Sequence, residues 1–476
     1  MKSVALHNLG CKVNSYELEV MQQMLQENGY EVVPFDQVAD IYIINTCTVT
    51  NIADRKSRQM LHRAKQKNPD AIVVAVGCYV QTGKEAVEKD ECIDLAIGNN
   101  RKKDLASILK EYLKERELLR TGEQEMMDKT LGDTTVIDIN HTYEYEEMQL
   151  VQTAEHTRAY IKIQDGCNQF CSYCVIPYAR GRVRSRHMED ILTEVKGMVA
   201  AGYQEIVLTG IHISSYGIDF EEEAFKEGKS VEVRRAEERL DYSGRSKLID
   251  LVERLNEIDG LKRIRLGSLE PRIVTLEFAQ RLASMEKVCP HFHLSLQSGC
   301  DETLKRMNRH YTTDEYAESV GYLRSVYEDP AITTDVIVGF PGETEEEFAM
   351  TREFLKKIKF YEMHVFKYSK REGTKAAVMK DQVPDQIKTA RSNVLLEMER
   401  EQSKEYREKY LNKTVEVLTE EVKSIGKNRY LTGHTSNYIK IAILLSTSQT
   451  EVELNKLMRV HTIEILPEGI VFGKEM

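Results

Sequence analysis

The sequence lacks any apolar run long enough to cross a membrane. A transmembrane helix needs about 20 consecutive, mostly apolar residues, and no such stretch occurs in the 476 residues. The start of the chain, Met1 to Asn8, also lacks the apolar segment of a secretory signal peptide. We therefore expect no membrane partner and a cytoplasmic location.

Positive charge is also scarce relative to negative charge. The 66 lysines and arginines stand against 77 aspartates and glutamates, which gives a formal net charge of −11. Net charge of this sign argues against indiscriminate binding to nucleic acid, because the phosphate backbone is also negative. A local basic patch remains compatible with this composition.

Disulfide bonds are not indicated either. The nine cysteines are an odd number, and no secretion signal accompanies them. In a cytosolic chain, cysteines at regular spacings point to metal binding or catalysis rather than to disulfides.

The most informative motif is the segment from Asp165 to Cys174. Within it Cys167, Cys171 and Cys174 have the spacing C-x3-C-x2-C, with Tyr173 before the last cysteine. Cysteine thiolates hold iron–sulfur clusters, and three of them leave one iron of a four-iron cubane open to an external ligand. The pattern predicts a [4Fe–4S] cluster whose open iron binds the amino and carboxylate groups of S-adenosylmethionine, with Tyr173 in the same cofactor site.

A zinc site is the main alternative for this motif. Such a site would need a fourth ligand, and His156 and His187 are poorly spaced for that role.

The first hundred residues alternate apolar, β-branched runs with polar helical stretches. This alternation predicts a parallel sheet with helical crossovers, that is, an α/β domain. The expected strands are 4–6, 41–44 and 72–76, and the expected helices are 15–27, 53–67 and 83–88.

Three further cysteines follow the three expected strands. Cys11, Cys47 and Cys78 each lie in the loop after a strand, and such loops emerge at the same edge of a parallel sheet. We predict that they hold a second cluster, again with one open iron. The alternative is three small buried apolar side chains, since free cysteine is often buried. The remaining three cysteines are expected to be ordinary ones: Cys92, Cys289 and Cys300.

The middle of the chain predicts an open, partial barrel of about six βα units. The expected strands are 160–163, 205–208, 263–266, 293–296, 334–338 and 362–366. Active sites of barrels lie at the carboxyl ends of the strands, and the C-x3-C-x2-C motif follows the first strand. The charged segment Ser214 to Lys247 interrupts the pattern and predicts a solvated insertion.

Polar residues and glycines at several strand ends suit a nucleoside-like cofactor. Glu270 can accept hydrogen bonds from ribose hydroxyls, and glycine allows a ligand to approach the backbone closely. Each such residue alone is more often part of a turn. The predicted cofactor-binding residues at these strand ends are Gly210, Glu270, Gln297 and Asp335.

Four arginines at alternate positions follow the C-x3-C-x2-C motif: Arg180, Arg182, Arg184 and Arg186. In an extended segment they would share one side. Arginine forks match phosphate oxygens, so we predict that these four side chains bind a nucleic-acid phosphate backbone. The alternative is a set of ion pairs with the surplus carboxylates.

The C-terminal part predicts a charged helical connector followed by four or five short strands. Short strands with turn residues between them are typical of a small, OB-like β-barrel. The expected domains are an N-terminal α/β domain over 1–115, a linker over 116–151, the barrel core over 152–383, the connector over 384–411 and the terminal barrel over 412–476.

Taken together, these motifs resemble the radical S-adenosylmethionine methylthiotransferases, over nearly the whole chain and including their C-terminal TRAM barrel. Within that family the chain is similar to the branch that modifies N6-threonylcarbamoyladenosine in tRNA. Lys12 and Val13 follow the first cysteine, where the isopentenyladenosine branch usually has Gln-Met and the ribosomal-protein branch has Pro-Lys. The segments that carry the resemblance are 9–17, 45–50, 165–186 and 293–300.

The resemblance implies two [4Fe–4S] clusters and S-adenosylmethionine as cofactors. One S-adenosylmethionine would methylate sulfur on the N-terminal cluster, and a second would yield a 5′-deoxyadenosyl radical at the other. The methylthio group would go to carbon 2 of the adenine in the tRNA anticodon loop, where bases can be splayed out. The implied partners are that loop and an electron donor such as flavodoxin or ferredoxin, while the oligomeric state stays open.

Other functions remain alternatives at this point. A relative could act on isopentenyladenosine or on a ribosomal-protein side chain. A non-enzymatic iron–sulfur protein that regulates RNA is the alternative from another class.

Overall fold

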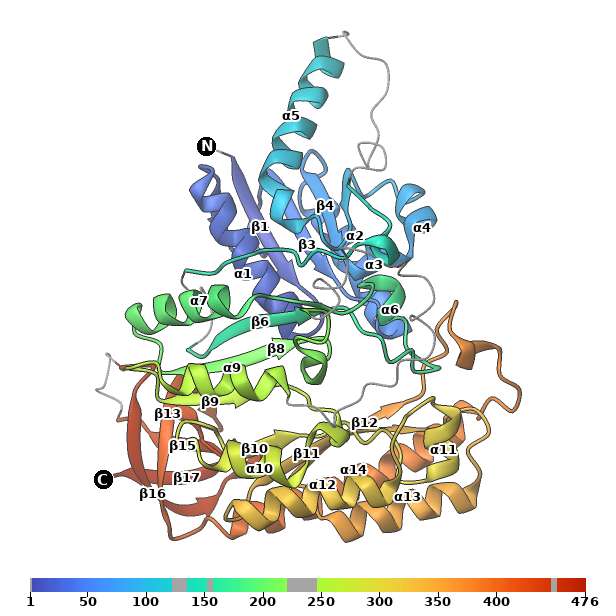
Figure 1. Cartoon of the computed structure of the whole chain (residues 1–476). Coiled ribbons are helices and arrows are strands. Elements are labelled where there is room, and N and C mark those ends of the chain that lie inside the picture. The colour runs from blue at the N-terminus through green and yellow to red at the C-terminus, as the bar shows by residue number, and fades with distance from the viewer. Residues whose placement is uncertain (1, 122–134, 152–156, 221–245, 447–451) are drawn as a thin grey trace.

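The structure is a computed structural model that describes residues 2–121, 135–151, 157–220, 246–446 and 452–476. Figure 1 shows three bodies: an N-terminal α/β domain in blue at the top, a central domain in green to orange, and a C-terminal barrel in red at the lower left.

The N-terminal domain is a five-stranded, all-parallel sheet of order β2-β1-β3-β4-β5. Its inner strands β3 and β4 are buried along their whole length, as expected when helices cover both faces. The strands are β1 (Ser3–Asn8), β2 (Glu31–Val33), β3 (Ile41–Thr46), β4 (Ile72–Gly77) and β5 (Leu95–Ile97). The helices are α1 (Lys12–Glu27), α2 (Asn51–Lys67), α3 (Cys78–Thr82), α4 (Lys84–Glu88) and α5 (Leu105–Thr121).

The predicted parallel α/β domain is therefore confirmed. The sequence analysis missed the edge strands β2 and β5, because three residues are too few to show a hydrophobic period. Helix α5 continues to Thr121, past the expected start of the linker at residue 116.

The central domain is an open barrel of six parallel strands, as predicted. One sheet has the order β7-β6-β8-β9 and the other β10-β11-β12, and bridges such as Leu269 to Leu294 connect them. Only the two-residue strand β7 runs antiparallel. The strands are β6 (Ala159–Asp165), β7 (Arg184–Ser185), β8 (Glu205–Gly210), β9 (Arg263–Leu266), β10 (His291–His293), β11 (Ala331–Val338) and β12 (Glu362–Lys367).

Helices cover the outer side of this barrel, and Figure 1 shows α12, α13 and α14 along β10–β12. Two of them begin with a complete capping box, Thr312 with Glu315 and Thr344 with Glu347, which satisfies free N–H groups of the first turn. The helices are α6 (Ile176–Ala179), α7 (Met188–Ala200), α9 (Lys247–Asn256), α10 (Leu276–Ala283), α11 (Asp301–Arg306), α12 (Thr313–Val326), α13 (Glu345–Ile358) and α14 (Asp385–Glu408).

The fourth of the six parallel barrel strands differs from its expected range of 293–296. Strand β10 spans His291–His293, and the following residues pair only through isolated bridges. Gln297 has a left-handed φ of 71°, which interrupts regular strand geometry there.

The C-terminal domain is a closed barrel of order β13-β14-β15-β17-β16, so the predicted small β-barrel is confirmed. It is anchored to the central domain: Arg263 Nη1 donates to the His434 carbonyl at 3.0 Å, and Arg265 Nη1 donates to the Ser436 carbonyl at 2.9 Å. Its strands are β13 (Thr414–Ile425), β14 (Asn428–Thr435), β15 (Lys440–Leu444), β16 (Leu457–Ile465) and β17 (Val471–Glu475).

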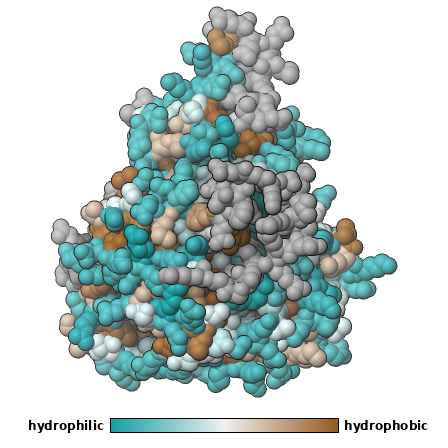
Figure 2. All heavy atoms as spheres, in the orientation of Figure 1, coloured by the Kyte–Doolittle hydropathy of each residue, from teal (hydrophilic) through white to brown (hydrophobic). Residues whose placement is uncertain are grey.

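Apolar side chains do not gather into a large patch on the face seen in Figure 2, where small brown groups are scattered among teal ones. Within the described ranges, no helix is long and apolar enough to cross a membrane. Most of the predicted insertion Ser214 to Lys247, namely residues 221–245, lies outside the described residues.

Candidate active site

Cys11, Cys47 and Cys78 lie at the carboxyl ends of three neighbouring strands, β1, β3 and β4. Gly10 lets the first two loops approach closely. It has a φ of 120°, and a Cβ added to it would lie 3.1 Å from the Cys47 Cβ and 3.3 Å from the Cys47 Sγ. The fold thus brings together three cysteines that are far apart in sequence.

The chemistry of these three thiols fits an iron–sulfur cluster. Burial, together with the neighbouring Cys78 and Cys11, raises the pKa of Cys47 to about 11. Asn99 Nδ2 donates to Cys78 Sγ at 3.5 Å. Cys11 is exposed, which an ordinary buried apolar cysteine would not be. Metal coordination deprotonates such thiols outright, so a cluster removes the conflict between burial and charge.

The C-x3-C-x2-C segment forms a tight loop directly after β6. Gly166 has a φ of 71°, and a Cβ on it would lie 1.8 Å from the Arg182 carbonyl oxygen, so only glycine fits. Cys167 N donates to the Gly181 carbonyl at 3.0 Å, and Asn308 Nδ2 donates to the Phe170 carbonyl at 3.1 Å. These bonds hold the loop from both sides.

Burial and neighbouring thiols oppose the ionisation of Cys167 and Cys174 in this loop. Burial raises the pKa of Cys167 to about 12, and Cys171 adds to the shift. Burial likewise raises the pKa of Cys174, with further contributions from Cys171 and Cys167. A donor set that is costly to ionise alone, yet gathered at one barrel end, fits a bound iron cluster.

Arg309 is a site residue that the sequence analysis missed. Its Nη1 donates to Cys171 Sγ at 3.2 Å, and its Nε donates to the Tyr311 hydroxyl oxygen at 3.0 Å. No motif in the sequence distinguishes this arginine from its neighbour Arg306, which pairs instead with Glu347. Only the fold shows that Arg309 is the cation beside the cysteines.

Two of the predicted cofactor residues, Tyr173 and Glu270, interact electrostatically with groups of this cysteine site. Arg309 interacts with both, and Glu270 also acts on Cys167. Glu270 is buried, and its Oε1 accepts from Arg272 Nε at 2.7 Å.

Gly210 and Asp335 lie on barrel strands, and Gln297 lies in the segment after β10. Gly210 ends β8 and pairs with Gln164 on β6. Gln297 is buried, and its N–H donates to the Asp335 carbonyl at 2.9 Å. The Asp335 carboxylate contacts two imidazoles, His293 Nε2 at 3.3 Å and His364 Nδ1 at 3.2 Å. Cofactor binding by these three residues stays a prediction.

The arginine run does not form the phosphate-binding surface that we predicted. Arg180, Arg184 and Arg186 are each 1% exposed or less. Arg180 Nη1 lies 3.0 Å from Asp165 Oδ2, and Arg186 contacts Glu194. Since buried charges need such partners, the ion-pair alternative is correct for this part of the run.

Arg182 differs from the other three arginines because it is half-buried. Its guanidinium carbon lies 4.3 Å from the centroid of the Phe170 ring, within the cysteine loop. Contact between Arg182 and RNA stays a prediction.

Comparison with known proteins agrees with this geometry. Residues 161–355 match the Radical SAM superfamily, and residues 3–98 match an uncharacterized protein family, UPF0004. The chain is 39% identical over 465 residues to the threonylcarbamoyladenosine tRNA methylthiotransferase MtaB of Bacillus subtilis, covering 98% of this chain and 94% of that protein. The chain belongs to the radical SAM methylthiotransferase family.

Three further proteins are also similar to this chain. The MtaB protein of Aquifex aeolicus is 39% identical, with coverage of 96% of this chain and 99% of the relative. The tRNA-2-methylthio-N(6)-dimethylallyladenosine synthase of Acetivibrio thermocellus is 35% identical, with coverage of 91% and 84%. The solved radical SAM methyltransferase TsrM of Kitasatospora setae shares the fold, with a TM-score of 0.54 at 16% identity over 79% of this chain and 74% of that one.

In this methylthiotransferase, a buried network of charges joins the N-terminal domain to the barrel. Glu17 on α1 is fully buried, and its Oε1 lies 2.7 Å from Lys162 Nζ and 2.9 Å from Arg180 Nη1. Lys102 pairs with its other oxygen. Asp165 completes the network, 2.7 Å from Lys162 Nζ.

The same network connects the two cysteine sites of the methylthiotransferase. Helix α1 begins directly after Cys11, and β6 ends at Asp165, two residues before Cys167. Asn14 Oδ1 accepts from Arg180 Nη2 at 2.6 Å. The network therefore links the two cysteine-bearing loops. One sequence signal could have revealed it, namely a lysine within the apolar strand 160–163.

Replacing Arg309 by methionine is expected to lower the reduction potential of the Cys167–Cys174 cluster by tens of millivolts. A cation that donates to a cluster sulfur stabilises the more negative, reduced form, so its removal favours the oxidised form. Redox titration followed by electron paramagnetic resonance measures the shift. The exposed Lys305→Met is the control, and equal potentials in all three proteins would contradict the assignment.

Proposed function

We propose that this protein adds a methylthio group to carbon 2 of N6-threonylcarbamoyladenosine next to the tRNA anticodon. The observation that carries the proposal is the pair of three-cysteine sites that one buried charge network connects. Two relatives with the same overall extent, each 39% identical, are named as enzymes of this activity.

In this proposal each cysteine set holds one [4Fe–4S] cluster. When bound, the clusters and S-adenosylmethionine supply the one-electron chemistry that opens an unactivated C–H bond, and the sulfur that replaces the hydrogen. An aromatic C–H offers no acidic proton to a side-chain base, so the chain's own residues serve to bind, orient and shield the reactants.

The barrel wall would bind S-adenosylmethionine. Glu270 Oε2 is buried and, among the described residues, has no hydrogen-bond partner, so it can accept from a ribose hydroxyl. The other residues proposed for this wall are Tyr173, Gly210, Gln297 and Asp335. A flavodoxin- or ferredoxin-type protein would supply the electron.

The tRNA would be held by local contacts, because the chain as a whole is acidic. The C-terminal barrel and Arg182 are the proposed surfaces. Deleting residues 412–476 is a poor test of this idea, since Arg263 and Arg265 would lose the partners that they have in the barrel. Replacing Arg182 by alanine leaves the barrel in place, so it is the better test of RNA contact.

The proposal predicts a specific change in tRNA nucleosides. A strain that lacks this gene should lose 2-methylthio-N6-threonylcarbamoyladenosine and accumulate the precursor without the methylthio group, as mass spectrometry of digested tRNA would show. A plasmid copy with Cys92→Ala should restore the product, because Cys92 lies outside both cysteine sites.

Other results would contradict this proposal. Loss of methylthio groups from isopentenyladenosine alone would favour the second tRNA substrate. Unchanged nucleosides, together with no release of 5′-deoxyadenosine by the reduced protein, would favour a non-enzymatic RNA-binding role.

A further inference from the structure

Lys12 is the first residue of α1 and directly follows Cys11. Its side chain is exposed, whereas most of the next two turns of the helix is buried. Within the described part of the chain, the Lys12 ammonium makes no hydrogen bond or salt bridge. It is thus a cation beside the N-terminal cysteine site that the chain leaves available.

The surroundings of this ammonium come from all three domains. Burial lowers the pKa of Lys12, and the titratable groups that act on it are Tyr438 in the C-terminal barrel, Arg158 just before β6, and Arg265 and Glu205 on barrel strands. Lys12 therefore reaches from the N-terminal domain toward the junction of the other two.

Two acids at this junction already have cationic partners. Glu205 Oε1 lies 2.9 Å from Arg265 Nε, and Glu420 Oε1 lies 3.2 Å from Arg158 Nε. Neither carboxylate is left to neutralise Lys12. Two acids of this junction are thus engaged by arginines rather than by Lys12.

The acids farther along the barrel wall are paired as well. Lys12 also acts on His364 of β12, which contacts Asp335 at 3.2 Å. Asp335 has a second partner in His293, and Glu362 Oε1 lies 3.2 Å from Arg407 Nη2. A free ammonium in such surroundings is suited to an anion that arrives with the substrate.

We propose that Lys12 binds the carboxylate of the threonylcarbamoyl group on the substrate adenine. The inference rests on the proposed function. The base must come close to Cys11 to receive its sulfur group, and its N6 substituent then carries the only carboxylate of the nucleotide into this region. A neutral dimethylallyl substituent gains nothing from the ammonium, so Lys12 contributes to the choice of substrate.

A binding experiment on the reconstituted full-length protein tests this role. The probes are two anticodon stem-loop RNAs of the same sequence, one with N6-threonylcarbamoyladenosine and one with plain adenosine. The unaltered protein should bind the first about tenfold or more tightly, as expected for a charged hydrogen bond. Lys12→Met keeps the length of the side chain, removes its charge and should abolish most of this preference.

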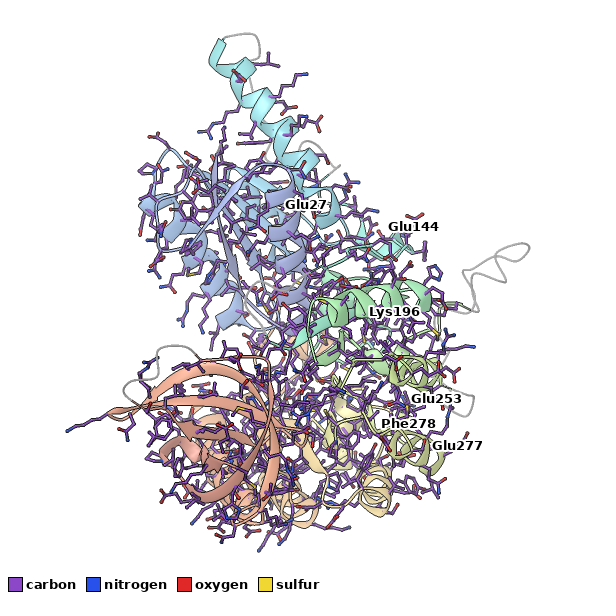
Figure 3. All side chains as sticks on the ribbon, turned by 90° about the vertical axis from the view of Figure 1, so that its left-hand side faces the viewer. Glu27, Glu144, Lys196, Glu253, Glu277 and Phe278 are labelled. Atoms are coloured by element: carbon purple, nitrogen blue, oxygen red, sulfur yellow. The ribbon has the colours of Figure 1, made fainter. Side chains whose placement is uncertain are left out.

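Lys196→Met is the matched control. Lys196 is an exposed lysine on α7, labelled in Figure 3, and its replacement should leave the preference unchanged. Iron content must be equal in all three proteins. A Lys12→Met protein that keeps the preference would overturn the proposal.

A modified ligand supplies a test that needs no variant. Methyl esterification of the threonylcarbamoyl carboxylate should weaken binding to the unaltered protein to the level of the plain adenosine RNA. In Lys12→Met the ester and the acid should bind equally.

A contact between Lys12 and the RNA phosphate backbone, instead of the carboxylate, would give a different result. Lys12→Met would then weaken both RNAs alike and reduce the salt dependence of binding, which would also overturn the proposal. Methylthiolation of the modified RNA by the unaltered protein tests the proposed function separately from the role of Lys12. If that reaction occurs and the preference survives in Lys12→Met, the proposed function stands and only the role of Lys12 fails.

Discussion

Replacing Cys171 by alanine should abolish both cleavage of S-adenosylmethionine and methylthiolation. Without the middle thiolate of the C-x3-C-x2-C loop, the cluster that binds S-adenosylmethionine cannot be held by three cysteines. Anaerobic reconstitution should then give about four irons per chain instead of about eight. Iron analysis and quantification of 5′-deoxyadenosine after reduction measure both effects.

Cys47→Ala separates the functions of the two sites. It should also halve the iron and stop methylthiolation, but it should leave S-adenosylmethionine cleavage, because Cys47 belongs to the N-terminal site. Cys92→Ala, outside both sites, should keep all the iron and both activities. An unaltered protein with only about four irons would contradict the N-terminal cluster.

Glu17→Gln should be the most destabilising substitution of a single charge at the domain boundary. It keeps the shape of the side chain but removes the carboxylate that pairs with Lys102, Lys162 and Arg180. Breaking a buried ion pair from one side costs about 3–5 kcal/mol of the free energy of unfolding. Urea unfolding of the full-length chain measures this loss of the free energy of unfolding.

The pH dependence of stability offers a second measurement on Glu17. Burial by itself would raise the pKa of Glu17, but Arg180, Lys102 and Lys162 outweigh it and hold the pKa well below its usual value. The stabilisation is therefore complete above the unfolded pKa of about 4.3 and is lost as pH falls toward the lower folded pKa. The gap between the unaltered protein and Glu17→Gln should narrow in that acid range.

The control for Glu17 lies on the same helix. Glu27 is exposed at the end of α1, as labelled in Figure 3, and Glu27→Gln should change the free energy of unfolding by about 0.5 kcal/mol or less. Equal stability of Glu17→Gln and Glu27→Gln would show that the buried network does not hold the domains together.

The sequence predicted the two cysteine sites for two different physical reasons. Spacing alone joins Cys167, Cys171 and Cys174, because a short loop must keep its own thiols together. Cys11, Cys47 and Cys78 became predictable only through the alternation of strands and helices, since parallel strands present successive loops at one edge. Both placements needed local patterns and a topology rule, but no detail of side-chain packing.

The arginine run shows where that kind of reasoning failed. Arginines at alternate positions in an acidic chain suggest exposed side chains. However, β7 pairs with β6 and places Arg184 in the interior. Whether a charge lies on the surface depends on the carboxylates that tertiary packing brings to it. Glu194, which is eight residues from Arg186, and Asp165, which is fifteen from Arg180, are such partners.

The sequence by itself determined the fold class, the order of the domains and the cysteines that can hold iron, because hydrophobic period and ligand spacing are local properties of the chain. Tertiary structure alone decided that Arg309 donates to Cys171, that Glu17 joins the two cysteine-bearing domains, and that Lys12 is left available. These roles depend on contacts between segments that lie far apart in sequence. Burial makes each such contact strong, and no local pattern records which segments will meet.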